Sequence, residues 1–580
     1  MSVNTSVYRT EPIHVFPELQ IQSGYAHLAR QIFTRLQDNY ATLVVSIDGF
    51  VGLPWTPFIT RLRTALELLE VEVKWFSTDS CLLPEERLDQ VLESYLTADP
   101  VFGRLYHGTL AELWDESAVT QLRTALEKAS GIRIVYGYGA SLFVPEGLHV
   151  YVDVPKDRGQ ALASQGEVYN VGSQRQHPFA QTYKRFYFVD WPMLNRIKRQ
   201  ELARMDLYVD GTSCDEPRMV GGDEFRHALH ALAQQPFRVK PWFAPGPWGG
   251  QWMKEQFGLP PEQPNYAWSF ELIAPENGLL LGNGEHAIEC AFDYLLWQET
   301  DAVLGVPVAA RYGSYFPIRF DYLDTMGGTN LSCQVHPRVD YIRNEFGEPF
   351  TQDETYYIVT CDPKARVYLG LREETDLESF KAAAYAARDQ KEPFEIDTYV
   401  NSQPSHPHDL FLIPSGTVHC SGANNLVLEI SATPYIFTFK IYDYLRSDLS
   451  GNLRHVHLDH AFANLEPTRR TDWVRDHLCP TPTQVRAGDG WAEYSIGTIE
   501  QLFFAIHRLE FHTQIDDQTA GKFVALNLVE GERCEILSEG NTAVELHFAE
   551  SIIIPASVGN YTLRNLSPAR PCKVVKAFVK

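Results

Sequence analysis

Three short stretches in the middle of the chain carry side chains that could bind a divalent metal ion. The first, LSCQVH at 331–336, places Gln334 and His336 on one face of an extended strand, because residues two apart in a strand point the same way. Glu354 begins a second strand-like stretch, and His419 follows a Pro/Gly turn in a third. Two imidazoles, a carboxylate and an amide oxygen are ligands suited to a divalent metal such as Zn²⁺. The sequence therefore predicts one metal site per chain.

The predicted site requires a fold that brings distant strands together. His336 and His419 are 83 positions apart, and a β-barrel is a fold that could join them. The stretch 331–336 suits a barrel strand, since its polar residues fall on one face and its apolar residues on the other. A chain with 19 histidines offers single Gln-x-His strands by chance. The ordered combination of a Gln-x-His strand, a Glu-led strand and a Pro-x-Gly-x-x-His turn is much more specific, and it favours metal binding.

These stretches resemble, in their order and their residues, the class I mannose-6-phosphate isomerases, which are zinc-dependent cupin proteins. That family has a Ser-x-Gln-x-His-Pro strand, a Glu before a Trp/Tyr-Tyr-Ile strand, and a Pro-x-Gly-x-x-His turn. The chain has SCQVHP at 332–337, ETYYI at 354–358 and PSGTVH at 414–419. Further matches are PWGG at 247–250 and FPIRF at 316–320, and the resemblance covers roughly 237–445.

The resemblance implies an aldose–ketose isomerase that converts mannose 6-phosphate to fructose 6-phosphate or acts on a related sugar. Its small-molecule partner would be a sugar or sugar phosphate. Two other functions stay open, namely a non-catalytic, metal-containing sensor of a sugar or sugar phosphate, and an oxygen-using cupin enzyme with Fe²⁺. The implied site has Zn²⁺, or another divalent metal, held by Gln334, His336, Glu354 and His419, with Trp248 and Ser332 lining the sugar site.

Two residues depart from the family's pattern. Gln352 stands where the family has a Lys two residues before the metal-binding Glu, and Lys440 stands where it has an Arg. A lysine cannot form bidentate hydrogen bonds to a phosphate or a diol as an arginine does. These changes therefore affect the expected binding of a phosphorylated substrate more than the expected binding of the metal. Lys440 is our candidate for the cationic or general-base role, because a desolvated lysine can have a lowered pKa.

The first third of the chain predicts a different kind of domain. Strand-like and helical stretches alternate there, beginning with LVVSI at 43–47 and a helical apolar pattern from Phe58 to Leu69. This alternation favours an α/β domain with a parallel sheet covered by helices.

The turn after the first predicted strand resembles a phosphate-binding P-loop of the nucleoside-kinase (uridine-kinase-like) type. Ile-Asp-Gly at 47–49 precedes the loop, as it does in that type. Pro54 and Trp55 replace the second Gly and the Lys of the motif, which removes an N–H donor and a positive charge. We therefore expect a degenerate kinase-like domain that transfers no phosphoryl group.

Turn-forming residues at 210–222 predict a linker, and a second barrel is predicted near the C-terminus. When Pro555 is aligned with Pro414, Asn560 falls opposite His419, and no Gln-x-His strand precedes it. The expected fold is an α/β domain followed by a mainly β double cupin, that is, two jelly-roll barrels with inserted helices. The predicted domains are a P-loop-kinase-like domain at 1–213, a metal-binding cupin domain at 214–475 and a cupin barrel without metal at 476–580.

Other histidines cluster at metal-like spacing but in polar, apparently irregular segments. We interpret them as solvated loop residues and not as ligands. They are His406, His408, His455, His457 and His460.

Composition excludes several classes of protein. The chain has 580 residues with 50 Lys+Arg against 74 Asp+Glu, a formal net charge of −24, which is the opposite of the basic footprint that nucleic-acid binding requires. None of the nine cysteines lies within four residues of another, so no CxxC motif is present. The sequence shows no apolar run long enough for a membrane span and no secretory signal. We expect a cytoplasmic protein without nucleic-acid or membrane partners, and the sequence leaves its oligomeric state open.

Overall fold

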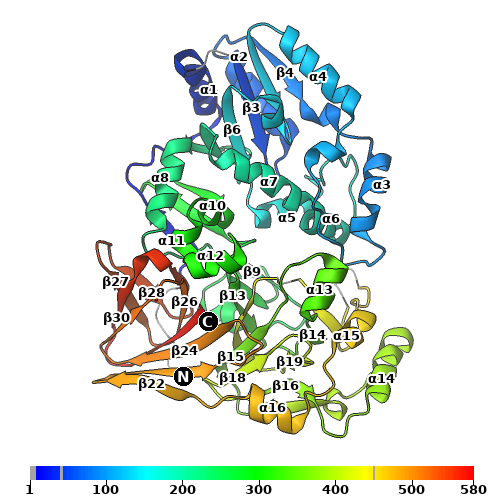
Figure 1. Cartoon of the computed structure of the whole chain (residues 1–580), viewed down its shortest axis with the longest axis vertical. Coiled ribbons are helices and arrows are strands. Elements are labelled where there is room, and N and C mark those ends of the chain that lie inside the picture. Colours follow the sequence, from blue (N-terminus) through cyan, green and yellow to red (C-terminus); the bar gives the residue numbers. More distant parts are fainter. Residues whose placement is uncertain (1–7, 40–42, 435, 448–450) are drawn as a thin grey trace. The chain divides into compact units, whose positions relative to one another are not determined.

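The computed structural model describes the whole chain except residues 1–7, 40–42, 435 and 448–450 (Figure 1). The chain divides into two compact units. The α/β unit contains Ile13–Leu232 and Pro275–Glu299, and the β-rich unit contains Ala233–Ala274, Thr300–Lys580 and the described residues before Ile13. The three-domain division expected from the sequence stays a prediction.

A seven-stranded sheet forms the centre of the α/β unit. The strand order is β2-β8-β7-β6-β3-β5-β4, and the five strands from β7 to β4 in that order run parallel. Strand β3 is buried along its whole length, because a central parallel strand is covered on both faces. The bounds are β2 Gln22–Ser23, β3 Val44–Gly49, β4 Val73–Ser77, β5 Ile132–Tyr136, β6 Leu148–Asp153, β7 Leu207–Asp210 and β8 Arg218–Gly221.

Helices follow the strands in alternation, which confirms the α/β class predicted for this part of the chain. Apolar side chains of α1 and α2 share one core with the central strands. The kinase-like assignment of the unit stays a prediction. The helices are α1 Tyr25–Asn39, α2 Trp55–Glu67, α3 Glu85–Leu96, α4 Glu116–Lys128, α5 Lys156–Ser164, α6 Phe179–Arg185, α7 Trp191–Leu202, α8 Gly222–Leu232 and α10 Phe292–Gln298.

A small three-stranded sheet completes the α/β unit. It joins the beginning of the described chain to a segment that returns after Pro275, since β1 pairs in parallel with β11. Its strands are β1 Ile13–Val15, β11 Gly278–Gly282 and β12 Ala287–Ala291.

The β-rich unit contains two β-sandwiches, each made of two antiparallel sheets. In the first sandwich a six-stranded sheet has the order β18-β15-β20-β13-β10-β9 and a five-stranded sheet has the order β17-β16-β19-β14-β21. The bounds are β9 Trp242–Ala244, β10 Trp268–Leu272, β13 Ile318–Asp324, β14 Cys333–Val335, β15 Glu354–Cys361, β16 Arg366–Leu371, β17 Val400–Pro404, β18 Leu410–Ile413, β19 His419–Ser421, β20 Asn425–Ala432 and β21 Phe439–Tyr442.

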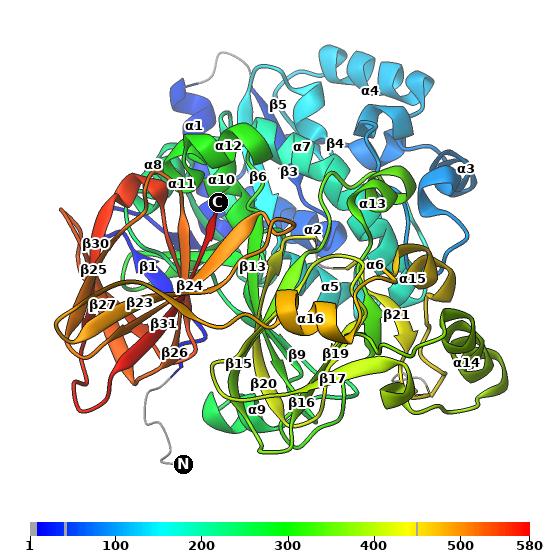
Figure 2. The ribbon, with the colours of Figure 1, turned by 60° about the horizontal axis from the view of Figure 1, so that its bottom comes forward.

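The second sandwich lies beside the first in the β-rich unit and is coloured orange to red (Figure 2). Its sheets have the orders β22-β23-β24-β31-β26-β29 and β25-β30-β27-β28, and one apolar core joins their inner faces. The bounds are β22 Thr483–Gly488, β23 Trp491–Gly497, β24 Phe504–Phe511, β25 Gln514–Gln518, β26 Val524–Glu530, β27 Arg533–Ser538, β28 Val544–His547, β29 Ser551–Ile554, β30 Asn560–Asn565 and β31 Cys572–Val579.

The helices of the β-rich unit are short and lie between strands in the sequence. Among the described residues, none of the helices in either unit has the length and apolar character needed to cross a membrane. The helices of this unit are α9 Trp252–Gln256, α11 Thr300–Leu304, α12 Val306–Tyr312, α13 Val339–Phe346, α14 Leu377–Gln390, α15 Leu458–Asn464 and α16 Thr471–Leu478.

Candidate metal centre

The four predicted ligands come together inside the first sandwich. Glu354 begins β15 in the six-stranded sheet, and His419 begins β19 in the five-stranded sheet. Gln334 on β14 pairs directly with His419, and His336 follows one residue after the end of β14. All four side chains are buried. The non-local pairing of β14 with β19 therefore brings together residues that are far apart in the sequence.

The distances within this group are short. His336 Nε2 lies 3.0 Å from Glu354 Oε2, and His419 Nε2 lies 2.7 Å from Glu354 Oε1. One ligand atom from each of these three residues can be chosen so that all lie within 4.8 Å of one another. Three ligands with this spacing can surround a single ion.

Hydrogen bonds at the Nδ1 atoms of His336 and His419 decide which nitrogen of each ring faces Glu354. His336 Nδ1 lies 3.0 Å from the Phe437 carbonyl oxygen, and His419 Nδ1 lies 2.9 Å from the Thr417 carbonyl oxygen. A carbonyl can only accept, so each Nδ1 carries the hydrogen and each neutral ring turns the lone pair of Nε2 toward Glu354.

This arrangement fits a bound cation. Without one, two nitrogen lone pairs would face the oxygens of a buried carboxylate, and Glu354 Oε1 has no hydrogen-bond donor among the described residues. Burial by itself raises the pKa of Glu354, but the interactions of the carboxylate with His336 and His419 hold the pKa of this carboxyl well below its usual range. A divalent ion between the three residues removes the conflict, and their donor set suits Zn²⁺.

Gln334 is placed for the fourth position but is turned away from it. Its Nε2 lies 3.3 Å from His419 Nε2, while its Oε1 accepts a hydrogen bond of 3.4 Å from Ser332 Oγ. The amide must turn over to present its oxygen to an ion held by the other three residues. Ser332 thus contacts Gln334, and its predicted place in the sugar site stays a prediction.

Lys440 shares a face with Gln334. The two residues are directly opposite each other in the β14–β21 register, so their side chains lie on the same side of the sheet. Burial lowers the pKa of Lys440 to about 8, the charge of Arg454 lowers it further, and Asp443 opposes both effects. A lysine with this pKa can exchange a proton near neutral pH.

Trp248 packs within the fold. Its side chain is buried, and its ring meets the ring of Trp268 edge to face with centroids 4.6 Å apart. Its carbonyl oxygen accepts the backbone N–H of Thr329. The structure therefore gives Trp248 a packing role, and its predicted contact with a sugar stays a prediction.

A buried ionic cluster next to Glu354 was missed in the sequence. Arg319 forms ion pairs with Glu429 and Asp321, and its Nε donates to Ser431 Oγ at 2.6 Å. Ser431 is also the cross-strand neighbour of Glu354. The signal that could have found this cluster is the alternation of Arg and Asp with large apolar residues in IRFDYLD, which is unusual for a strand with both faces buried.

Gln352 belongs to the same cluster. Its amide fits with its oxygen accepting from Arg319 Nη2 at 3.0 Å and its nitrogen donating to the Pro434 carbonyl at 2.9 Å. A lysine at this position, as in the family's pattern, would face the Arg319 guanidinium. The glutamine that stands at 352 in place of the family's lysine is therefore compatible with the neighbouring Arg319.

The other histidine clusters are only partly the solvated loops that we expected. His406 and His455 are exposed. His457 is buried, and its Nδ1 accepts the backbone N–H of Lys440 at 3.2 Å. His408 lies 2.7 Å from Glu530, and His460 lies on α15 with its ring stacked on Phe439. For these three residues the expectation was wrong, because an irregular segment can still pack against a sheet and because His460 lies on a helix.

The chain is homologous to mannose-6-phosphate isomerases over about 57% of its length. The Bacillus subtilis (strain 168) mannose-6-phosphate isomerase ManA is 25% identical over 342 residues, which are 57% of this chain and 96% of that protein. The YvyI protein of the same organism is 26% identical over 348 residues, which are 57% of this chain and 97% of that protein.

A solved structure and a family model also match. The crystal structure of the mannose 6-phosphate isomerase from Bacillus subtilis has 20% sequence identity and a TM-score of 0.48, and the match covers 59% of this chain and 99% of that chain. A family model described as a domain of unknown function (DUF8485) matches residues 24–234. The end of this match lies close to Leu232, where the first segment of the α/β unit ends.

Proposed function

We propose that the chain is a zinc-dependent aldose–ketose isomerase that interconverts mannose 6-phosphate and fructose 6-phosphate or a related pair of sugar phosphates. The observation that carries the proposal is the buried group of His336, Glu354 and His419, whose nitrogen and oxygen atoms converge on one point. The homology to mannose-6-phosphate isomerases supports the choice of reaction and substrate.

Each chain would hold one ion through His336, Glu354, His419 and, after its amide turns, Gln334. When bound, such an ion supplies a Lewis acid that favours negative charge on a nearby sugar oxygen. The histidines hold their orientation through the carbonyls of Phe437 and Thr417, and Glu354 is held by the strand pairing of β15 with β20. Zn²⁺ is the metal proposed, and the donor set also suits other divalent ions.

Lys440 would carry the proton. In this isomerisation the hydrogen on carbon 2 of the aldose leaves as a proton and a proton is added at carbon 1, while the hydroxyl at carbon 2 becomes a carbonyl and the aldehyde becomes an alcohol. A neutral amine at Lys440 can accept the first proton and return it, because its lowered pKa keeps part of the population neutral near pH 7 to 8. Its place opposite Gln334 puts the amine on the face that the ligands share.

The test is to follow mannose 6-phosphate and fructose 6-phosphate by NMR with the full-length protein, first as isolated, then after chelation, and finally after Zn²⁺ is restored. We expect turnover that is lost on chelation and regained with metal. Saturable binding of mannose 6-phosphate without turnover in the metal-loaded protein would overturn the proposal and support a sugar-phosphate sensor. Oxygen consumption with Fe²⁺ would instead support an oxygen-using enzyme.

A further inference from the structure

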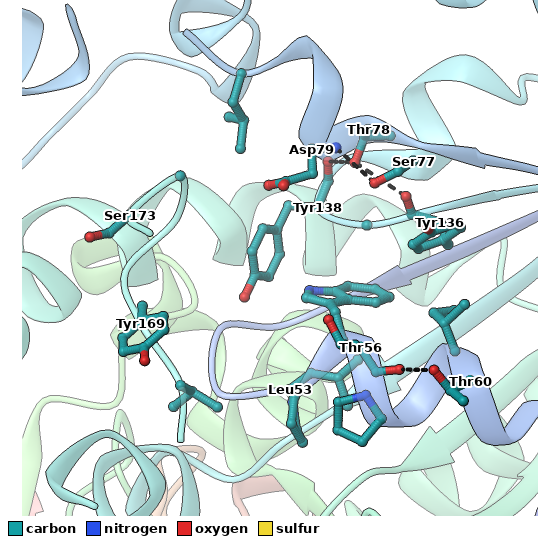
Figure 3. A pocket seen from close by; sticks show the side chains of 18 of the residues that line it. Leu53, Thr56, Thr60, Ser77, Thr78, Asp79, Tyr136, Tyr138, Tyr169 and Ser173 are labelled. Carbon is teal, nitrogen blue, oxygen red and sulfur yellow. Dashed lines mark hydrogen bonds between the residues drawn. The ribbon is translucent and has the colours of Figure 1, made fainter. Parts of the chain in front are cut away.

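A cavity of about 700 Å³ lies within the α/β unit at the carboxyl end of its parallel sheet (Figure 3). Its walls come from the segments that follow β3, β4 and β5, together with residues 167–173. In open α/β sheets, ligands bind outside the carboxyl ends of the strands. The volume is within the range of small-molecule sites. The position and size of the cavity therefore suit a ligand.

The cavity lacks part of the donor set of a phosphate-binding loop. In the turn after β3, the N–H of Gly49 donates to its neighbour Asp48 at 2.9 Å, and the N–H of Phe50 donates to the Val152 carbonyl at 3.1 Å. The N–H of Leu53 donates to the Phe50 carbonyl at 3.3 Å. These backbone groups are already used inside the fold, and the next residue is a proline, which has no N–H.

The indole of Trp55 takes the space above the same turn. Its ring lies so close to Gly49 that a Cβ atom at Gly49 would come within 3.1 Å of it. A phosphate group in the position that a P-loop provides would have to share this space with the ring.

The charges that line the cavity are more negative than positive. They are Arg63, Asp79 and Glu167. The guanidinium of Arg63 lies over the ring of Trp75, 5.1 Å from its centroid. Asp79 is exposed, and among the described residues no cation forms an ion pair with it. A phosphate ester would meet net repulsion here, whereas a hydroxyl group can donate to Asp79.

Aromatic rings and hydroxyl groups make up much of the remaining wall. The rings of Trp55 and Tyr138 meet edge to face with their centroids 5.6 Å apart, and Tyr169 is 38% exposed. Figure 3 shows Asp79 and Tyr138 on one side of the cavity and Tyr169 and Ser173 on the opposite side. The hydroxyl side chains of the wall, besides the tyrosines, belong to Thr56, Thr60, Ser77, Thr78 and Ser173.

We propose that this cavity binds an uncharged ligand that combines a ring with vicinal hydroxyl groups, such as a free sugar or the ribose part of a nucleoside. The two hydroxyls donate to the carboxylate of Asp79, and the ring packs against Tyr169. The hydroxyl-rich wall favours such a ligand over an organic cation, because hydroxyl groups exchange hydrogen bonds with one another. The proposal concerns the α/β unit alone and does not depend on the activity proposed for the metal centre.

The experiment is calorimetric titration of the full-length protein with D-glucose, D-mannose, adenosine and uridine, and with mannose 6-phosphate and AMP as phosphorylated counterparts. We expect at least one neutral probe to bind with a Kd below about 10 mM. Asp79→Asn should weaken this binding about tenfold or more, because it removes charge-assisted hydrogen bonds. Tyr169→Ala should weaken it by a similar factor through loss of the ring contact. Sugar and nucleoside probes distinguish the two sources of the ligand.

Matched controls lie in the same unit outside the cavity wall. Asp89→Asn changes an exposed carboxylate on α3, and Phe179→Ala removes an exposed ring on α6, so both should leave binding unchanged. Melting curves of all four variants show whether the fold is kept. The proposal is overturned if none of the four neutral probes binds, if choline binds in their place, or if AMP binds more tightly than adenosine. Equal affinities in wild type and in folded Asp79→Asn and Tyr169→Ala would also overturn it, because binding would then lie elsewhere.

Discussion

Glu354 and His419 belong to two different sheets of the first sandwich, yet their side-chain atoms approach to 2.7 Å. The contact places a carboxylate from one sheet against an imidazole from the other in the buried interior. An ion at this point would therefore link the two sheets as well as take part in catalysis. Its removal should lower both the stability of the sandwich and the activity.

His419→Ala should distinguish a predicted metal ligand from the other histidines of the chain. The substitution removes one of two imidazoles, so metal affinity should fall by more than about a hundredfold, the upper end for changes that leave the ligands in place. Activity should fall with it. His406→Ala is the control, because His406 is exposed and pairs only with Asp409 among the described residues. Elemental analysis after dialysis measures the outcome, and equal metal content in the two variants would contradict the assignment.

Lys440 gives a prediction for the dependence of rate on pH. Because burial lowers its pKa to about 8, the neutral amine forms as the pH rises through that value. We expect kcat to rise over roughly pH 7 to 9 and then level off. Lys440→Met should lower kcat by about 10²- to 10⁴-fold, the usual contribution of a general base. A pH profile of Lys440→Met that keeps the same rising limb would assign the base elsewhere.

The same lysine gives a prediction for the dependence of stability on pH. The unfolded chain keeps this proton up to the ordinary lysine pKa of about 10.4, whereas the folded chain releases it at about 8. Between the two values the unfolded state binds more protons, so this group's contribution to stability rises with pH there. Below about pH 8 the buried ammonium lowers the stability of the fold by its full amount. Lys440→Met should therefore melt at or above the wild-type temperature at pH 7, with the difference shrinking toward pH 10. A large drop in Tm at pH 7 would contradict this.

Gln352→Lys tests the match between Gln352 and Arg319. The new ammonium would lie beside a buried guanidinium, 3.0 Å from the present amide oxygen. We expect the free energy of unfolding to fall by about 0.5 to 3 kcal/mol, because Glu354 Oε2, 3.4 Å from the present side-chain amide, offsets only part of the repulsion from the guanidinium. Urea denaturation measures it, with Gln390→Lys at an exposed position of α14 as the control. Similar unfolding midpoints for both variants would show that the cluster tolerates a second cation.

Mg²⁺–ATP should bind the full-length protein more weakly than about 1 mM, because Pro54 and Trp55 remove the N–H and the charge that a P-loop uses. Calorimetry with and without Mg²⁺ measures this. A micromolar, Mg²⁺-dependent affinity would contradict both this prediction and the neutral ligand proposed for the cavity.

The local motifs singled out four side chains that the fold brings together, because each motif lies in a short strand or turn. Gln334 and His336 share a face through strand geometry alone, and His419 was found from its Pro/Gly turn. The sequence could not show that Gln334 pairs with His419 or that Glu354 lies opposite Ser431, because strand register between distant segments depends on the whole sheet.

Packing roles were harder to predict. His457 stands in a polar and apparently irregular segment, so the sequence favoured solvent for it, whereas tertiary contacts bury its side chain. Nothing local in the sequence indicates that β11 and β12 join a sheet with β1.

The return of Pro275–Glu299 to the α/β unit has a consequence for how the protein can be divided. The backbone passes between the two units at four places along the sequence, so neither unit is one continuous stretch of the gene. A fragment that stops at 213 lacks β8, α8 and the pair β11 and β12, and it would leave the edge of β7 without a neighbour. A protease that cuts a single connection leaves the units still covalently joined by the others. The two units are therefore made and retained as a single covalent piece.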